Sequence, residues 1–313
     1  MVKKPVNQMT PGLQFVVILL FTILVVLICN LLAIGLIMLF YGFDEGINLT
    51  KGLFNGPNIA SELFLLQLLG ATAPLFIAPA FFANVIVKEP RAYLKATFRF
   101  QWMLIVVVFF VMLISSPLIE LSANINQKMV LPEFLKGLEE WMKRSEEAAK
   151  KLTAIILRMD NIGDCIKNVI LIGLLTAIAE EFLFRGVLQT IMQRWTKNTH
   201  ATVWITAALF SAFHMEFYGF LPRMFLGALF GYFVAWSGSI WPAVWGHFIN
   251  NGSIVVVTYL FQHKIIKIDP DDQHVFNYTG YVFSFIIIII LLAVYKKIAS
   301  GQPSPEINGE ELG

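Results

Sequence analysis

Residues 177–186 read AIAEEFLFRG and place three ionisable side chains inside an apolar segment that runs from about 167 to 192. Glu181 and Arg185 are four residues apart, so a helix puts them on one face, where they can pair. Glu180 lies about 100° around the helix from Glu181 and has no such partner on its C-terminal side. A charge at the middle of a bilayer costs at least about 2.5–3.5 kcal/mol on insertion scales. The stretch therefore predicts a membrane helix whose charged residues face the interior of a helical bundle.

The composition of the whole chain agrees with a membrane protein. Of the 313 residues, 57% are hydrophobic and 14% are charged, whereas roughly 25% of an ordinary soluble domain is charged. The mean hydropathy of +0.71 excludes a soluble globular protein and a disordered one. Continuous apolar runs also disfavour a spanning β-barrel, in which apolar and polar residues alternate. The net charge is only +2, and without a strong basic patch no nucleic-acid partner is expected.

We predict an all-α, polytopic membrane bundle of about eight transmembrane helices, since roughly 20 apolar residues are needed to cross a bilayer. The expected spans are 13–42, 63–87, 101–122, 167–192, 200–217, 219–237, 240–262 and 279–298. In terms of regions, residues 1–130 hold the N-terminal membrane helices, 131–165 an amphipathic helix outside the membrane, 166–300 the membrane core with the polar residues, and 301–313 a disordered tail.

Basic residues in the short connections predict the orientation. They form four groups on one side of an even number of spans: Lys3 and Lys4; Lys88, Arg91, Lys95 and Arg99; Arg194 and Lys197; Lys296 and Lys297. Because basic loops stay in the cytoplasm, both termini are expected to be cytoplasmic. The short loops and this bias favour a multi-pass protein of a bacterial inner membrane.

The segment 132–160 is predicted to be an amphipathic helix. Its apolar residues recur at steps of three and four: Phe134, Leu138, Trp141, Ala148, Leu152 and Ile155. Glutamates precede basic residues by four positions, as in the pair Glu139 and Lys143, which indicates a solvated charged face. We expect the helix on the outer membrane surface or packed over the bundle, either as a shield or as a substrate gate.

Two further spans carry polar side chains. Phe210 precedes His214 by one turn and could fix its ring, and His247 shares a helical face with Asn251. Glutamate and histidine together can hold and deprotonate a water molecule, while a second histidine and an asparagine can donate hydrogen bonds to an oxyanion. This chemistry is peptide-bond hydrolysis. Two histidines and a glutamate are also a zinc set, although no His-Glu-x-x-His signature occurs. Two other interpretations of these polar residues are a purely structural role in packing and a proton relay in a transporter.

The three polar motifs resemble those of a known family. In chain order they are Glu180-Glu181-x-x-x-Arg185, Phe210-x-x-x-His214 and His247-x-x-x-Asn251. Their order and spacing are similar to the motifs of the CPBP family, the CAAX proteases and bacteriocin-processing enzymes also called Abi proteins. The resemblance covers roughly residues 165–260 and extends to the type II CAAX prenyl endopeptidases.

The resemblance implies an intramembrane endopeptidase with its CPBP-like core at 166–300. Glu180 would be the general base and His214 would help to bind and orient the water. His247 and Asn251 would form the oxyanion site, and Glu181 with Arg185 would be the supporting pair.

The family is often described as metalloproteases, although its prenyl-protein branch works as glutamate proteases without a catalytic metal. We expect no cofactor here, and the alternative is zinc held by Glu180, His214 and His247. The expected partners are a peptide or protein substrate and the lipid bilayer. A non-catalytic membrane scaffold or immunity protein is the alternative to an enzyme.

Overall fold

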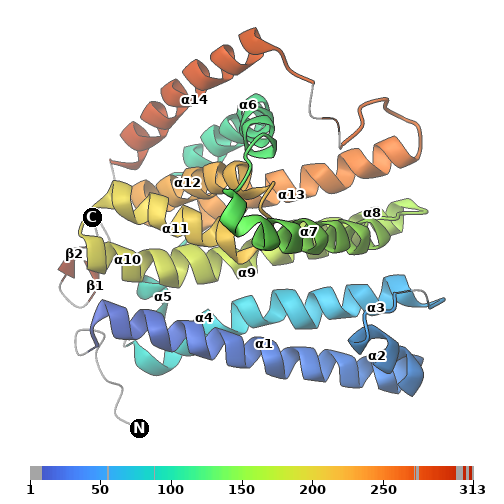
Figure 1. Ribbon diagram of the computed structural model, residues 1–313. Coiled ribbons are helices and arrows are strands. Elements are labelled where there is room, and N and C mark those ends of the chain that lie inside the picture. Colours follow the sequence, from blue (N-terminus) through green and yellow to red (C-terminus); the bar gives the residue numbers. More distant parts are fainter. Residues whose placement is uncertain are drawn as a thin grey trace.

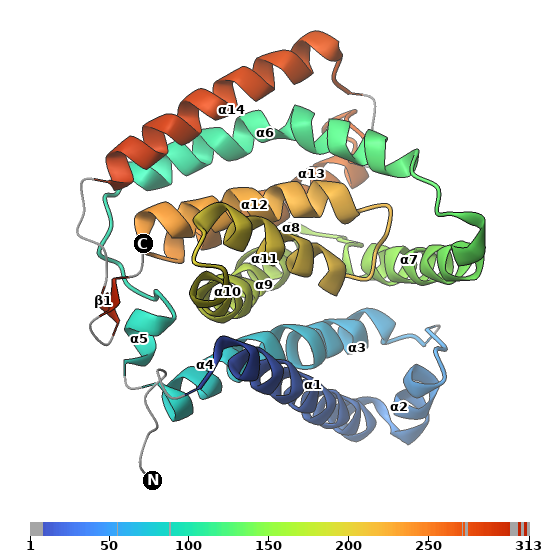
Figure 2. The ribbon, with the colours of Figure 1, turned by 60° about the vertical axis from the view of Figure 1, so that its left-hand side comes forward.

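The computed structural model describes residues 9–54, 56–87, 89–270, 272, 275–300, 306–307 and 310–311, and these are almost entirely helical (Figures 1 and 2). The N-terminal part contains α1 (Pro11–Tyr41), α2 (Phe43–Thr50), α3 (Ile59–Leu65), the π-helix η2 (Leu66–Thr72), α4 (Ala73–Ile86), α5 (Pro90–Tyr93) and α6 (Met103–Gln127). The 3-10 turn η3 (Glu133–Leu135) and α7 (Lys136–Ile156) follow.

The C-terminal half begins with one continuous helix built of α8 (Ile162–Asn168), η4 (Val169–Leu175), α9 (Thr176–Glu181), η5 (Phe182–Leu188) and α10 (Gln189–Thr196), in which η4 and η5 are π-helical. The remaining helices are α11 (Thr199–Phe213), α12 (Phe220–Ser237), α13 (Trp241–Gln262) and α14 (Tyr278–Ala299). Asparagine side chains cap the first turns of α8, α11 and α14, since Asn161, Asn198 and Asn277 each accept a hydrogen bond from a backbone N–H three residues later.

Six of the described helices are long and apolar enough to cross a membrane, so the chain is a polytopic helical membrane protein. They are Pro11–Tyr41, Ile59–Ile86, Met103–Gln127, Ile162–Thr196, Phe220–Ser237 and Tyr278–Ala299. Helices also stand at the other two predicted positions. However, α11 has 15 residues, a length of about 22 Å against a hydrocarbon core of about 30 Å. The helix α13 is long enough but carries His247, Asn250 and Asn251. The count of eight spans stays a prediction.

The helices pack in three layers (Figures 1 and 2). On one side, α1 packs against η2 and α4. The middle layer contains the long helix from Ile162 to Thr196 together with α11, α12 and α13. On the other side, α6 packs against α12 and α13, and α14 covers α6. The middle layer is therefore enclosed by protein on both sides, which allows it to bury charged side chains.

Several basic connections meet at one end of the bundle. Thr190 in α10 donates to the Tyr93 carbonyl (3.4 Å), and the backbone N–H of Ile240 donates to the Lys95 carbonyl (3.0 Å). These bonds join the α4–α6 connection to α10 and to the turn between α12 and α13. The arrangement agrees with the predicted placement of Arg91, Lys95 and Arg194 on one side.

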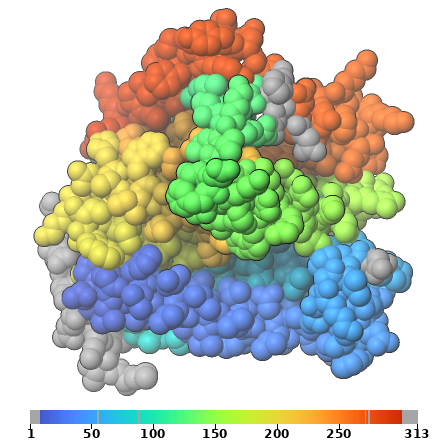
Figure 3. All heavy atoms as spheres, viewed as in Figure 1, coloured from blue at the N-terminus to red at the C-terminus, as the bar shows by residue number. Residues whose placement is uncertain are grey.

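The predicted amphipathic helix is present as α7, which lies across the middle layer (green in Figure 3). The expectation of a solvated acidic face is wrong for Glu139 and Glu146, which are buried although they pair with Lys143 (2.7 Å) and Lys150 (3.2 Å). Both carboxylates point at Tyr218, whose hydroxyl donates to Glu139 (3.3 Å) and whose backbone N–H donates to Glu146 (3.2 Å).

The apolar stripe of α7 turns away from the protein at its N-terminal end, where Phe134, Leu138 and Trp141 are exposed. In the C-terminal tail, Glu306–Ile307 and Glu310–Glu311 form the short antiparallel strands β1 and β2. The rest of the predicted disordered tail, and Lys3, Lys4 and Lys88, lie outside the described residues.

Candidate active site

The predicted pair of Glu181 and Arg185 is confirmed and lies at the centre of the bundle. Arg185 Nη1 donates to Glu181 Oε1 over 2.9 Å, and both side chains are 0% exposed. The second terminal nitrogen of Arg185 donates to the carbonyl of Gly227 in α12 (3.0 Å). The guanidinium also stacks over the Phe210 ring at 4.6 Å, a favourable cation–π contact for a buried cation. The pair thus connects α9, η5, α11 and α12.

His247 is joined to the same carboxylate. Its Nδ1 lies 2.9 Å from Glu181 Oε1, and its ring stacks on Phe230 at 5.0 Å. Because an ionised carboxylate only accepts hydrogen bonds, Nδ1 carries the proton and Nε2 is left to face the opposite direction. That nitrogen lies 3.7 Å from Glu180 Oε2.

His214 approaches the same oxygen from the end of α11. Its Nδ1 donates to the Phe210 carbonyl (2.9 Å), because a carbonyl can only accept, and its ring meets the Phe210 ring at 69°. The expectation that Phe210 fixes His214 is confirmed. His214 Nε2 then lies 4.0 Å from Glu180 Oε2.

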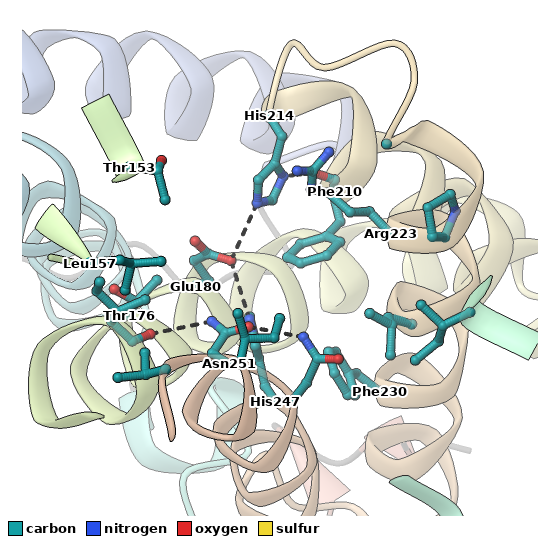
Figure 4. A pocket seen from close by; sticks show the side chains of 18 residues that line it. Thr153, Leu157, Thr176, Glu180, Phe210, His214, Arg223, Phe230, His247 and Asn251 are labelled. Atoms are coloured by element: carbon teal, nitrogen blue, oxygen red, sulfur yellow. Dashed lines mark hydrogen bonds and ion pairs between the residues drawn. The ribbon is translucent and has the colours of Figure 1, made fainter. Parts of the chain in front are cut away.

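The imidazoles of His214 and His247 both face the carboxylate of Glu180 (Figure 4). It is 8% exposed and stands between two π-helical segments, η4 and η5. Such wide turns recur at functional sites, since they change which side chains a helix presents on one face. The separations of 3.7 and 4.0 Å exceed a direct hydrogen bond and are of the size that a bridging water fits.

Asn251 lies one turn beyond His247 and completes the predicted set. Its side-chain N–H donates to the Ile172 carbonyl (3.3 Å), and its oxygen accepts from Asn250 (3.1 Å). The orientation of the amide is therefore fixed, and one N–H remains for another acceptor. Asn250, which the sequence reasoning did not select, acts here as an orienting neighbour.

A cavity of about 420 Å³ joins these residues. Glu180, Phe210, His214, His247 and Asn251 all line it, whereas Glu181 and Arg185 stand behind its wall. Its other lining residues include Thr153, Leu157, Thr176, Gly219, Arg223 and Asn250. Thr153 and Leu157 belong to α7 and the turn after it, so this helix covers one side of the cavity. The sequence contained no signal for this, because the two residues are ordinary members of a helical pattern.

The residues do not fit a zinc ion in this arrangement. Tetrahedral zinc with ligand bonds of about 2.0–2.1 Å brings neighbouring ligand atoms to about 3.3 Å, and the two imidazoles stand 3.7 and 4.0 Å from Glu180. Within the part of the chain that the structure describes, no group of three His, Cys, Asp or Glu side chains is placed to hold a metal.

Comparison with known proteins agrees with the motifs. Residues 163–253, which run from α8 into α13, match the family described as "Type II CAAX prenyl endopeptidase Rce1-like". This segment is a domain of the Rce1-like type II CAAX prenyl endopeptidase family. It contains Glu180, His214, His247 and Asn251, and the resemblance drawn from the motifs is confirmed. The matched segment thus corresponds to most of the middle layer and carries the polar residues that line the cavity.

A curated relative extends the comparison. Over 114 residues the chain is 31% identical to "Uncharacterized protein YpbD" of Bacillus subtilis (strain 168). The matched stretch covers 35% of this chain and 54% of that protein, so the chain spans about half the length of this relative. No solved structure matches the chain.

Proposed function

We propose that the protein is an intramembrane endopeptidase in which Glu180 activates a water molecule. One observation carries the proposal: Glu180 Oε2 faces the Nε2 atoms of His247 and His214, at 3.7 and 4.0 Å, in a cavity that also holds Asn251. A carboxylate and an imidazole nitrogen that converge at these distances can hold one water between them. The family of the domain supports peptide hydrolysis as the reaction.

In the proposed reaction Glu180 acts first as a base and then as an acid. Glu180 removes one proton from the water as the water oxygen bonds to the peptide carbonyl carbon, while His214 Nε2 accepts a hydrogen bond from the hydrogen that stays on that oxygen. The carbonyl oxygen becomes an oxyanion that accepts hydrogen bonds from Asn251 and from protonated His247 Nε2. When the C–N bond breaks, Glu180 returns its proton to the leaving amine, so protons and electrons balance.

Glu181 supports this role of His247. For Nε2 to donate while Nδ1 remains bonded to Glu181, the imidazole must be an imidazolium. The Glu181 carboxylate, 2.9 Å away, stabilises that cation and fixes the plane of the ring. Arg185 in turn holds the Glu181 carboxylate in place through the 2.9 Å bond from its Nη1. The buried network thus positions the Nε2–H of His247 for the negative charge that develops on the substrate carbonyl oxygen during the reaction.

The proposal extends to the setting of the site. The substrate is a peptide or protein that reaches the cavity from the bilayer or its surface, and no cofactor is required. All eight predicted helices, including α11 and α13, are spans of a bacterial cytoplasmic membrane. With an even number, both termini are cytoplasmic.

The test compares purified wild-type protein with Glu180→Gln on a quenched peptide library that contains prenylated and unprenylated members. We expect cleavage by the wild type and a loss of at least about 100-fold in Glu180→Gln. Glu140→Gln is the matched control, because Glu140 is an exposed carboxylate on α7 outside the cavity. Equal cleavage by wild type and Glu180→Gln would refute the assignment.

Three added measurements separate the alternatives. Metal analysis of the same preparation should find no stoichiometric zinc, and a chelator should leave cleavage unchanged. If cleavage is lost on chelation and returns when zinc is added, Glu180, His214 and His247 belong to a metal site. A non-catalytic scaffold would instead keep its biological function in Glu180→Gln, and a transporter would move solute in sealed vesicles without forming a peptide product.

A further inference from the structure

Arg223 is a charged residue of the cavity that the proposed reaction does not use. It lies in the first turn of α12, and it is the only Lys or Arg among the described residues that line the cavity. Its side chain is 27% exposed, and one terminal nitrogen, Nη2, forms an ion pair with Glu216. The other, Nη1, is buried and has no hydrogen-bond partner among the described residues. A buried donor without an acceptor carries a free-energy cost, which an acceptor on a bound ligand would remove.

The guanidinium is held at the cavity wall. Nη1 packs against the backbone of Gly219, where a Cβ atom would collide with it, and Gly219 also lines the cavity. The ion pair with Glu216 fixes the plane of the fork from the other side. Figure 4 shows the Arg223 side chain extending toward the part of the cavity where His214 lies. Two neighbours thus orient the fork and leave one end of it unused.

Charge is distributed unevenly in the cavity. Glu180 is its only lining carboxylate among the described residues, and Arg223 comes from a different helix. Glu180 would repel a negatively charged group on a bound peptide. Arg223 could donate a hydrogen bond to that group from Nη1, since Glu216 pairs with Nη2 alone. Such a pair of opposite charges would therefore fix the direction in which a peptide lies across the site.

We propose that Arg223 is a specificity-determining residue that binds a carboxylate of the peptide substrate. Two sources share this chemistry: the free C-terminal carboxylate and an aspartate or glutamate side chain near the scissile bond. Arginine suits either one, since its planar fork matches a carboxylate with directed hydrogen bonds. The inference rests on the proposed peptidase function and adds the chemical class of group that its substrate carries.

The test uses peptides in matched pairs. One pair differs only in a free or amidated C-terminus, and the other only in glutamate or glutamine beside the scissile bond. We expect wild type to prefer the carboxylate member of one pair, and that pair identifies the source. In Arg223→Gln the ratio of kcat/KM between the two members should fall by about 10- to 100-fold. Arg99→Gln is the matched control, because Arg99 is exposed and outside the cavity.

Two further variants guard against misfolding and against failure of the peptidase assignment. Gly219→Ala should lower the same ratio while it keeps the arginine, because the added methyl displaces the guanidinium. In Glu180→Gln, the dissociation constants of the same pairs should show the preference without cleavage. If that preference is present and wild type cleaves nothing, the carboxylate subsite stands and the peptidase proposal fails. If wild type cleaves both members of each pair equally, or Arg223→Gln keeps the preference, the inference is overturned.

Discussion

Replacing Glu181 by alanine should be one of the most damaging single changes in the middle layer. Glu181 Oε1 accepts from Arg185 Nη1 and from His247 Nδ1, each over 2.9 Å, and all three side chains are nearly or completely buried. Glu181→Ala removes both bonds and leaves the Arg185 cation without its counterion. Removing one partner of a buried ion pair costs about 3–5 kcal/mol. The cation–π contacts of Arg185 remain but do not replace a carboxylate.

A double-mutant cycle isolates this effect. Arg185→Met should cost less than Glu181→Ala, because Glu181 keeps His247 as a partner, and the double variant Glu181→Ala/Arg185→Met should recover much of the loss since no charge is then unpaired. The assay is thermal unfolding in one detergent, where about 3–5 kcal/mol corresponds to a fall in Tm of at least about 6 °C. Exposed Glu140→Ala serves as the control. A Glu181→Ala variant within about 1 kcal/mol of wild type would refute the reasoning.

Three other predictions concern the surroundings of the site. Lys143, bonded to Glu139, holds the pKa of that carboxyl below its usual value of 4.5. The contribution of the Glu139 carboxylate to docking α7 is full above about pH 4.5 and is lost as the pH falls through the lower folded-state pKa, so hydrogen-exchange protection in α7, measured against the intrinsic rate at each pH, should be lower at pH 3 than at pH 6. Tyr218→Phe removes the hydroxyl bond to Glu139 and should increase exchange in α7 by roughly the equivalent of 1 kcal/mol at pH 7, with no change in α14. A Cβ on Gly173 would lie 3.3 Å from Gly252 Cα, so Gly173→Val should separate η4 from α13 and reduce cleavage, whereas exposed Gly137→Val should not.

Much of the site could be predicted because it depends on spacing within single helices. The Glu181–Arg185 ion pair and the bond from His214 to the Phe210 carbonyl both join residues four apart. Helical geometry dictates such neighbours wherever the helices pack. The polar residues of the site could also be recognised because they lie within apolar spans, where the bilayer makes buried charge costly.

Other features could not be predicted, since they depend on how separate helices meet. The α7 pattern correctly indicated a helix but not its orientation, because Tyr218, more than 70 positions away, supplies hydrogen bonds to Glu139 and Glu146. The π-helical turns η4 and η5 leave no composition signal in their apolar sequences. The early end of α11 at Phe213 was also missed, because the apolar residues Met215 and Phe217 extended the predicted span to 217.

The sequence by itself determined that the chain is a helical membrane protein, which residues pair within a helix and, through three spaced motifs, which family the domain belongs to. Only the tertiary structure decided that Glu180 meets His214 and His247, that α7 covers the cavity and that Arg223 enters its wall. The physical reason is that the helical repeat fixes neighbours three or four residues apart. Contacts such as that of Glu181 with His247, 66 positions away, depend instead on the packing of whole helices.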